Sequence, residues 1–179
     1  MAENTTTVEK KTENKEERPK NRRERRVRSG GRAPRERREF EQRILAIRRV
    51  ARVMKGGRRF SFSVTLAAGD MKGRVGVGLG KGADTALAIE KALRDAKKNM
   101  ITISRTPESS IAHDVRAKFG ASVIELRPAP ARGIIAGGAV RTILELGGVR
   151  DISAKILSRS KNHLNNARAT VDALKQLKK

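Results

Sequence analysis

The side chains of this sequence that could do chemistry are mostly cationic. Its 179 residues include 42 Lys and Arg against 19 Asp and Glu, which gives a formal net charge of +23. A small domain stays soluble with a net charge of only about 2 to 8, and a larger excess destabilises a compact fold unless a polyanion neutralises it. The excess favours nucleic acid as the partner, because Lys and Arg release condensed counterions when they bind phosphates.

Catalytic and metal-binding groups are sparse in comparison. The sequence has no Cys, which excludes a disulfide framework and a zinc finger. Its two histidines, His113 and His163, are far apart and have no carboxylate cluster near them, so we expect both to be ordinary surface or packing residues. The acidic residues after Glu41 are scattered as in caps, turns and salt bridges. These features predict no enzyme, no metal site and no cofactor.

A glycine-rich segment, residues 76–83, follows a predicted strand and precedes a predicted helix, where phosphate-binding loops occur. A Walker loop needs Gly-x-x-x-x-Gly-Lys-Ser/Thr, but here Gly82 follows Lys81 and Val75 stands at the first glycine position. Residues 78–83 fit Gly-x-Gly-x-x-Gly/Ala, yet no acidic residue lies about 20 positions later and the flanking strands read as antiparallel. We expect no bound nucleotide. The interpretation is instead that the backbone approaches a large RNA surface here, with Lys81 on a phosphate.

Aromatic residues make up only 2% of the chain: Phe40, Phe60, Phe62 and Phe119. This scarcity disfavours binding by stacking on unpaired bases. Phe60 and Phe62 sit near the signature of an RNA-recognition strand, but Arg59 is followed directly by Phe60, and Ser61 replaces the small Gly or Ala. Their spacing places both on one face of a strand, and we expect both to pack in the core beneath a helix.

The first 40 residues have too few large apolar side chains to form a core. From residue 18 to 38 there are eleven Lys or Arg and two Glu. We expect residues 1–40 to be a disordered, arginine-rich arm that becomes ordered on RNA.

A first α+β domain is expected at residues 41–105. Residues 44–54 mix apolar and basic side chains, and period-two alternation over 60–66 and 75–79 indicates strands. Turns are expected at 55–58 and 69–73. Asp84 is the expected N-cap of a helix reaching about Met100. Its predicted apolar face is Ala86, Ile89, Leu93, Ala96 and Met100, and its basic face is Lys91, Arg94, Lys97 and Lys98. The pattern gives three antiparallel strands covered by one helix.

A second α+β domain, residues 111–179, is expected after a linker at 106–110. Strands are predicted at 115–119, 122–126 and 151–157, with Pro128 and Pro130 breaking the pattern after the second. A short helix over 139–146 is stopped by Gly147 and Gly148, and the apolar face near it suits a protein neighbour as well as RNA. A last helix begins at about Asn165 and places Ala167, Val171, Leu174 and Leu177 near one face.

Several stretches match one protein family in order across residues 40–177: 53–62, 69–70, 73–81, 88–92, 96–100, 133–141, 144–149, Lys155, Asn162 and 168–170. They resemble the bacterial small-subunit ribosomal protein number five family. The chain departs from the family pattern at 131–133, which is shorter and lacks an acid, and at 158–161, which is one residue longer.

The resemblance implies a double-stranded-RNA-binding-like domain followed by a domain with a left-handed βαβ crossover. It implies assembly into the small ribosomal subunit and contact with its ribosomal RNA, with small-subunit proteins four and eight, and with messenger RNA (mRNA) where it enters. Residues 55–58 would lie where the family affects spectinomycin sensitivity. The face toward protein four, which bears on decoding accuracy, would include Arg132, Gly133 and Arg141.

The charge is spread over the three regions, with about +6 for residues 1–43, +10 for 44–105 and +7 for 106–179. The middle domain is therefore the main predicted RNA-binding region. The residues expected to contact RNA are Arg48, Arg49, Arg52, Lys55, Gly56, Gly57, Arg58, Arg59, Lys72, Arg74, Lys81, Lys97 and Lys98.

Alternatives to a ribosomal protein remain open at this point. The arginine-rich arm would also suit a free-standing RNA chaperone or translational regulator, and the glycine segment alone motivates an ATP-dependent helicase. An anionic membrane surface is the alternative to nucleic acid as a partner for the positive charge. However, the sequence has no apolar run near the roughly 20 residues of a spanning helix and no signal-peptide core after its polar start. We expect a cytoplasmic protein that does not contact a membrane.

Overall fold

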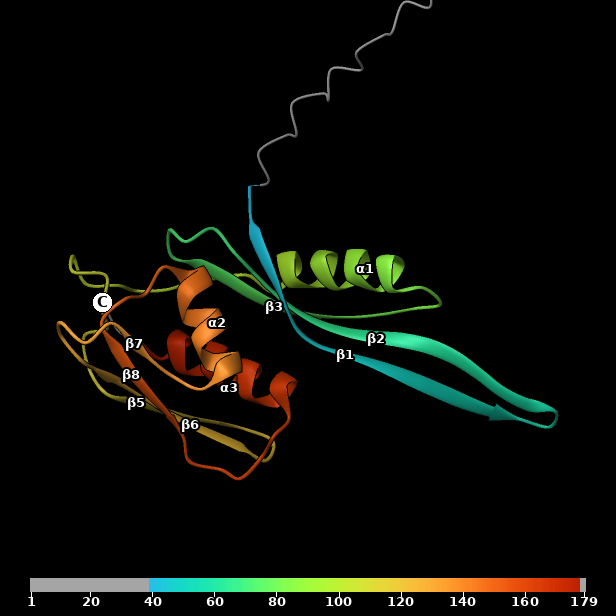
Figure 1. Cartoon of the computed structure of the whole chain (residues 1–179). Helices are drawn as coiled ribbons and strands as arrows, with labels where there is room; N and C mark the ends of the chain where they lie inside the picture. Colours follow the sequence, from blue (N-terminus) through green and yellow to red (C-terminus); the bar gives the residue numbers. More distant parts are fainter. Residues whose placement is uncertain (1–38, 178–179) are drawn as a thin grey trace, which may run out of the picture. The chain divides into compact units, whose positions relative to one another are not determined.

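The computed structural model describes residues 39–177, in which two four-stranded sheets and three helices are formed (Figure 1). The arm expected at residues 1–40 lies almost wholly outside this range. The predicted α+β class is confirmed, with an antiparallel sheet preceding a βαβ-type unit.

The first sheet consists of β1 (Glu41–Met54), β2 (Gly57–Gly69), β3 (Arg74–Gly82) and β4 (Ile101–Thr102), in that spatial order and all antiparallel. The three strands that the sequence predicts are confirmed. The short β4 was not predicted, because two residues are too few to show an alternating pattern. A register shift between Ile44 and Ala46 gives β1 one extra residue against β2.

Helix α1 (Thr85–Lys98) packs on one face of this sheet through small residues. Its predicted N-cap is confirmed, because the Asp84 carboxylate accepts a hydrogen bond from the Thr85 N–H at 2.7 Å. Most of the predicted apolar face is confirmed, because Ile89, Leu93, Ala96 and Met100 belong to the cluster packed against the sheet. Ala88, Ala92 and Ala96 are buried and Ala86 is exposed, so the line of closest contact runs through the alanines.

The glycines of β3 explain this close packing. They point at α1, and a Cβ on Gly78 would lie 2.0 Å from the carbonyl oxygen of Ala92. A Cβ on Gly76 or Gly80 would lie equally close to the helix backbone, at 2.3 and 2.1 Å. The interpretation of this segment as an RNA-facing strand end was therefore wrong, because its glycine face is covered by a helix.

The second sheet contains β5 (Val115–Phe119), β6 (Ser122–Pro128), β8 (Ile152–Ile156) and β7 (Ile134–Ile135), in that spatial order. β5, β6 and β8 are antiparallel neighbours, whereas β7 runs parallel to β8. Helix α2 (Gly138–Gly147) joins this parallel pair and completes a βαβ unit. It ends at Gly148, whose φ of 66° is the left-handed conformation that glycine adopts most easily.

Helix α3 (His163–Lys175) begins two residues earlier than the sequence indicated. The Asn162 side chain accepts a hydrogen bond from the Leu164 N–H at 3.1 Å and so caps the first turn. The strand β7 was not predicted, since two residues of a parallel edge carry no periodic signal.

One large core joins the two sheets. The residues of β2 and β3 that face away from α1, among them Ala67, Val75 and Val77, belong to the same buried cluster as α2, α3 and the second sheet. The apolar face of α2, including Val140, Ile143 and Leu144, is part of this core. The expectation that this face meets a protein neighbour or RNA was therefore wrong, because the face is buried within the chain. The division into domains at residues 106–110 stays a prediction.

Candidate nucleic-acid interface

The strands β1 and β2 continue well beyond the third strand of their sheet. β3 pairs with β2 only from Gly69 to Phe62, whereas the β1–β2 pairing goes on to Met54 and Gly57. Residues 50–61 therefore form a two-stranded arm, called the ribbon below, whose tip is the turn at Lys55 and Gly56 (Figure 1). An isolated two-stranded hairpin is marginally stable in water, so the ribbon gains from an external surface.

Cations gather on the ribbon and at its base. Arg52 and Arg59 are direct cross-strand partners, and like charges in this position repel each other. Within residues 39–177 none of the ribbon's cations has a carboxylate partner. The exposed cations that the structure brings together here, all of them predicted, are Arg48, Arg49, Arg52, Lys55, Arg58 and Arg59. The predicted Gly56 lies in the turn at the tip, and the predicted Gly57 begins β2 directly after it.

One face of the ribbon carries an exposed aromatic ring beside the Arg49 cation. The Arg49 guanidinium lies 4.3 Å from the centre of the Phe60 ring, and the Phe60 side chain is 46% exposed. The prediction that Phe60 packs in the core was wrong, because the third strand and α1 do not extend that far. Phe62, the last residue of β2 that pairs with β3, does pack against the α1 cluster. The periodicity of the sequence correctly placed Phe60 and Phe62 on one face of β2. It could not show where the helix that covers this face ends.

The other face of the ribbon continues into the sheet as a row of cations. Arg48, Ser63 and Lys81 are neighbours across β1, β2 and β3. Because side chains alternate along a strand, Arg52 and Arg59 share this face. Lys81 therefore lies on the sheet face that continues this face of the ribbon, whereas the glycines of β3 face α1 on the other side.

The remaining predicted RNA contacts, Lys72, Arg74, Lys97 and Lys98, lie toward the opposite end of β2. There the Asp70 carboxylate accepts hydrogen bonds from the backbone N–H groups of Lys72 and Arg74, at 2.8 and 2.9 Å, and from Arg74 Nε at 2.7 Å. Burial opposes ionisation of Asp70, but these hydrogen bonds outweigh it and hold its pKa below the ordinary 3.8. Arg74 is therefore anchored in a turn.

Phe40 connects two of these cations. Its ring centre lies 5.2 Å from the Arg74 guanidinium carbon and 5.5 Å from Lys97 Nζ. Both distances are those of cation–π contacts. The structure thus separates the predicted residues into a group at the ribbon and a smaller group at the opposite end of β2, two of which contact Phe40.

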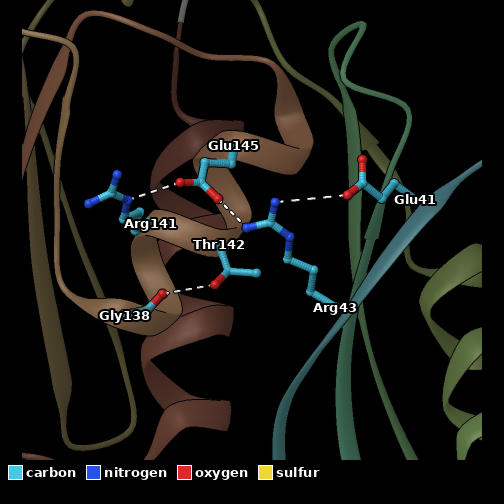
Figure 2. Close-up of polar contacts among 6 residues, drawn as sticks. All are labelled: Glu41, Arg43, Gly138, Arg141, Thr142 and Glu145. Atoms are coloured by element: carbon cyan, nitrogen blue, oxygen red, sulfur yellow. Dashed lines mark hydrogen bonds and ion pairs between the residues drawn. The ribbon is translucent and has the colours of Figure 1, made fainter.

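The residues expected to face protein four lie beside α2. Arg141 Nε donates a hydrogen bond to Glu145 Oε1 at 2.9 Å, and the other Glu145 oxygen pairs with Arg43 of β1 (Figure 2). The hydrogen bond from Arg141 lowers the pKa of Glu145 from its ordinary 4.5, against the opposing effect of burial, and Arg43 lowers it further. Arg141 is thus already paired within the chain.

Gly133 and Arg132 belong to the loop before β7. Gly133 has a φ of 67°, and its N–H donates to Asp151 Oδ1 at 3.1 Å while its carbonyl accepts from the Ile152 N–H at 3.0 Å. Arg132 is exposed. The backbone of the loop is therefore held to the start of β8.

The part of the chain that the structure describes offers little for other chemistry. His113 and His163 are exposed, as expected. No group of three His, Asp or Glu side chains in residues 39–177 could hold a metal ion. No helix in this range has the length and apolar character needed to cross a bilayer.

Comparison with known proteins decides the family. The model of the ribosomal protein S5 N-terminal domain matches residues 40–104, and that of the ribosomal protein S5 C-terminal domain matches residues 117–179. The chain belongs to the ribosomal protein S5 family. Both halves of the resemblance inferred from the sequence are thereby confirmed.

Individual relatives of this S5-family chain support the assignment over most of its length. A small ribosomal subunit protein uS5c of Rhodomonas salina is 50% identical over 141 residues, which are 78% of this chain and 83% of the relative. The uS5c protein of Emiliania huxleyi is 47% identical over 141 residues, 78% of this chain and 88% of the relative. The uS5 protein of Microcystis aeruginosa is 47% identical over 152 residues, 84% of this chain and 87% of the relative.

Proposed function

We propose that this S5-family chain is a structural constituent of the small ribosomal subunit and binds its ribosomal RNA chiefly through the ribbon. The relatives' names support the place of assembly, and the ribbon supports the mode of binding.

The facing pair Arg52 and Arg59 is the observation that carries the proposal. Two guanidinium groups on opposite strands, with no carboxylate partner in residues 39–177, destabilise the ribbon in the free chain. A phosphate bound between them turns this repulsion into two charge-assisted hydrogen bonds. The arrangement therefore favours RNA as the ribbon's partner.

The finer assignments are proposals that rest on the family resemblance. We infer that Lys55 and Arg58 at the ribbon's tip affect the response to spectinomycin, and that the loop carrying Arg132 and Gly133, with Arg141, faces small-subunit protein four and bears on decoding accuracy. Protein eight is the second expected protein neighbour, and mRNA is an expected contact where it enters the subunit.

The proposal is tested by gradient sedimentation of the tagged full-length chain from cell lysate. We expect the wild-type chain to sediment with small subunits in a fixed stoichiometry. Lys55→Glu and Arg58→Glu should lower its occupancy in the subunits or change spectinomycin sensitivity, because each reverses a charge at the ribbon's tip. Lys118→Glu, the same change at an exposed residue of β5, is the matched control and should behave as wild type.

Two results would contradict the proposal. Sedimentation of the wild-type chain away from small subunits, together with binding to many RNAs, would instead establish the free-standing chaperone or regulator. Equal subunit occupancy and spectinomycin response of the Lys55→Glu, Arg58→Glu and Lys118→Glu variants would contradict binding through the ribbon. The glycine segment was the only feature that favoured an ATP-dependent helicase. Its glycines in β3 pack against α1, so it does not support that alternative.

A further inference from the structure

A hollow of about 590 Å³ lies beside the Arg43–Glu145 ion pair, away from the ribbon. It is lined by residues of β1, of the turn after β2, of the segment after β4, of β7, and of the C-terminal end of α2 and the residues that follow it. Figure 2 shows Arg43 reaching from β1 to Glu145 of α2, and both residues line the hollow. The volume falls in the range of about 300 to 1,000 Å³ typical of small-molecule sites.

Three arginines and one glutamate supply the charge of this hollow: Arg43, Arg105, Arg150 and Glu145. Glu145 is held in its ionised form by Arg141 and Arg43. Arg150 is exposed and has no carboxylate partner within residues 39–177. The lining side chains therefore have a net positive charge, which favours an anion.

The C-terminal end of α2 opposes an anion, because helix carbonyls place negative charge there. Arg105 compensates for this effect. Its NH1 group donates to the carbonyl oxygen of Gly148 at 2.9 Å, and its NH2 group donates to the carbonyl oxygen of Lys72 at 2.7 Å. These bonds fix the guanidinium at the wall of the hollow and leave further N–H donors for a ligand.

The backbone around the hollow is held in an uncommon conformation. Of the three non-glycine residues with positive φ in residues 39–177, two line the hollow: Met71 at 57° and Ser109 at 61°. The Met71 N–H is bound to the Leu146 carbonyl at 2.9 Å, and the Ser109 carbonyl accepts from the Arg150 N–H at 2.7 Å. Such conformations persist only where the surroundings enforce them, and they are concentrated at functional sites.

We propose that this hollow binds a phosphate group carried on an RNA strand. The planar guanidinium groups of Arg105 and Arg150 suit the oxygens of a phosphate, and Arg43 adds charge from β1. Met71, which is 46% exposed, and Ile134 give the hollow an apolar wall against which the adjoining sugar or base packs. The inference rests on the proposed function and adds a second RNA contact, distant from the ribbon, to it.

Arginine-specific modification of the full-length chain by phenylglyoxal, read by peptide mass spectrometry, tests this inference. The chain is modified alone and with purified small-subunit ribosomal RNA, inorganic phosphate or AMP, all at one ionic strength. We expect ribosomal RNA to slow modification of Arg150 and Arg105 on the order of tenfold and also to protect Arg58 of the ribbon. Arg159, which is exposed and does not line the hollow, is the internal control and should change little.

A matched pair of variants completes the test. Arg150→Gln should weaken binding of the same RNA by about tenfold, the loss of a charge-assisted contact, and Arg159→Gln by less than about twofold. Arg150 is exposed and its side chain makes no hydrogen bond in residues 39–177, so its replacement leaves the fold intact.

The outcomes separate this inference from the proposed function. Protection of Arg58 without protection of Arg150 would contradict RNA binding in the hollow but not RNA binding by the ribbon. Equal losses of RNA affinity for Arg150→Gln and Arg159→Gln would have the same meaning. If inorganic phosphate or AMP protects Arg150 as strongly as ribosomal RNA does, the hollow binds free phosphate groups and the assignment to an RNA strand is wrong. Absence of protection at both Arg58 and Arg150 would contradict the proposed function as well.

Discussion

At the scale of single residues, Phe60 and Phe62 show how two identical side chains on one face of one strand acquire different roles. Phe62 is paired with Gly82 of β3 and packs against the cluster beneath α1. Phe60 lies beyond the last β3 residue, exposed and stacked with Arg49. Phe62 thus stabilises the fold, and Phe60 is available to a partner.

Replacing each ring by alanine should separate these roles. Phe62→Ala should lower the free energy of unfolding by about 2 to 3 kcal/mol, because it opens a cavity under the end of α1. Phe60→Ala should cost less than about 1 kcal/mol, the value of an exposed cation–π contact, yet weaken RNA binding. Urea denaturation and RNA titration of both variants check this. Similar losses of stability would show that Phe60 is also a core residue.

The ion pairs of Glu145 predict a dependence of stability on pH. The folded state lowers the pKa of Glu145, through Arg141 first and Arg43 second. A lowered pKa means that ionised Glu145 stabilises the fold above its ordinary value of 4.5 and that this contribution is lost as the pH falls through the lower folded value. Glu145→Gln should therefore cost about 1 to 2 kcal/mol at pH 7 and progressively less below pH 4.5.

Urea denaturation between pH 7 and about 3 measures that difference. Glu108→Gln is the matched control, since Glu108 is exposed and has no ion-pair partner within residues 39–177. It should leave the unfolding free energy unchanged at each pH. A Glu145→Gln deficit that is constant over the whole range would show that the carboxylate's charge does not matter.

At the scale of elements, the contact between β3 and α1 depends on residues without large side chains. Gly76, Gly78 and Gly80 of β3 face α1, whose Ala88, Ala92 and Ala96 are buried. Because the two backbones approach closely, the sheet accepts a helix on one face while α2 and α3 cover the other. This packing holds β2 rigid up to Phe62, from which the ribbon projects.

Adding a single methyl group should disrupt this contact. Gly78→Ala places a Cβ 2.0 Å from the Ala92 carbonyl oxygen, so α1 must move. We expect a loss of about 3 kcal/mol in the free energy of unfolding. Gly138→Ala, at the start of α2 with no atom within 4 Å of the new Cβ, should change it by less than about 1 kcal/mol, in the stabilising direction. Thermal and urea denaturation of the two variants provide the comparison, and equal effects would contradict the packing argument.

Local signals in the sequence explain which elements could be predicted. The alternation in β2 and β3 and the Asp84 cap depend on neighbouring residues, so they were readable. The pairing of Arg43 with Glu145 joins residues 102 positions apart, and no local pattern reports it. The ribbon's length was equally hidden, because it depends on where β3 stops relative to β2. The cations of the ribbon were therefore predicted, but their arrangement on two faces was not.

At the scale of the whole molecule, some of the cations are paired with carboxylates and others are not. Arg43, Arg74 and Arg141 are paired with carboxylates inside the fold, whereas the ribbon's cations have no such partner within residues 39–177. An unpaired cation gains most from a phosphate, because it breaks no existing ion pair. The ribbon should thus contribute more to RNA affinity than an equal number of cations elsewhere.

The salt dependence of binding to small-subunit ribosomal RNA tests this central claim most directly. The comparison is between wild type, Arg52→Gln/Arg58→Gln/Arg59→Gln in the ribbon, and a control that removes the same charge from exposed sites elsewhere, Lys91→Gln/Arg116→Gln/Lys118→Gln. Each lost phosphate contact reduces the slope of log K against log salt by about 0.7 to 0.9. We predict a slope reduced by about 2 to 3 for the ribbon variant and by less than about 1 for the control. Equal reductions in the two variants would contradict the account.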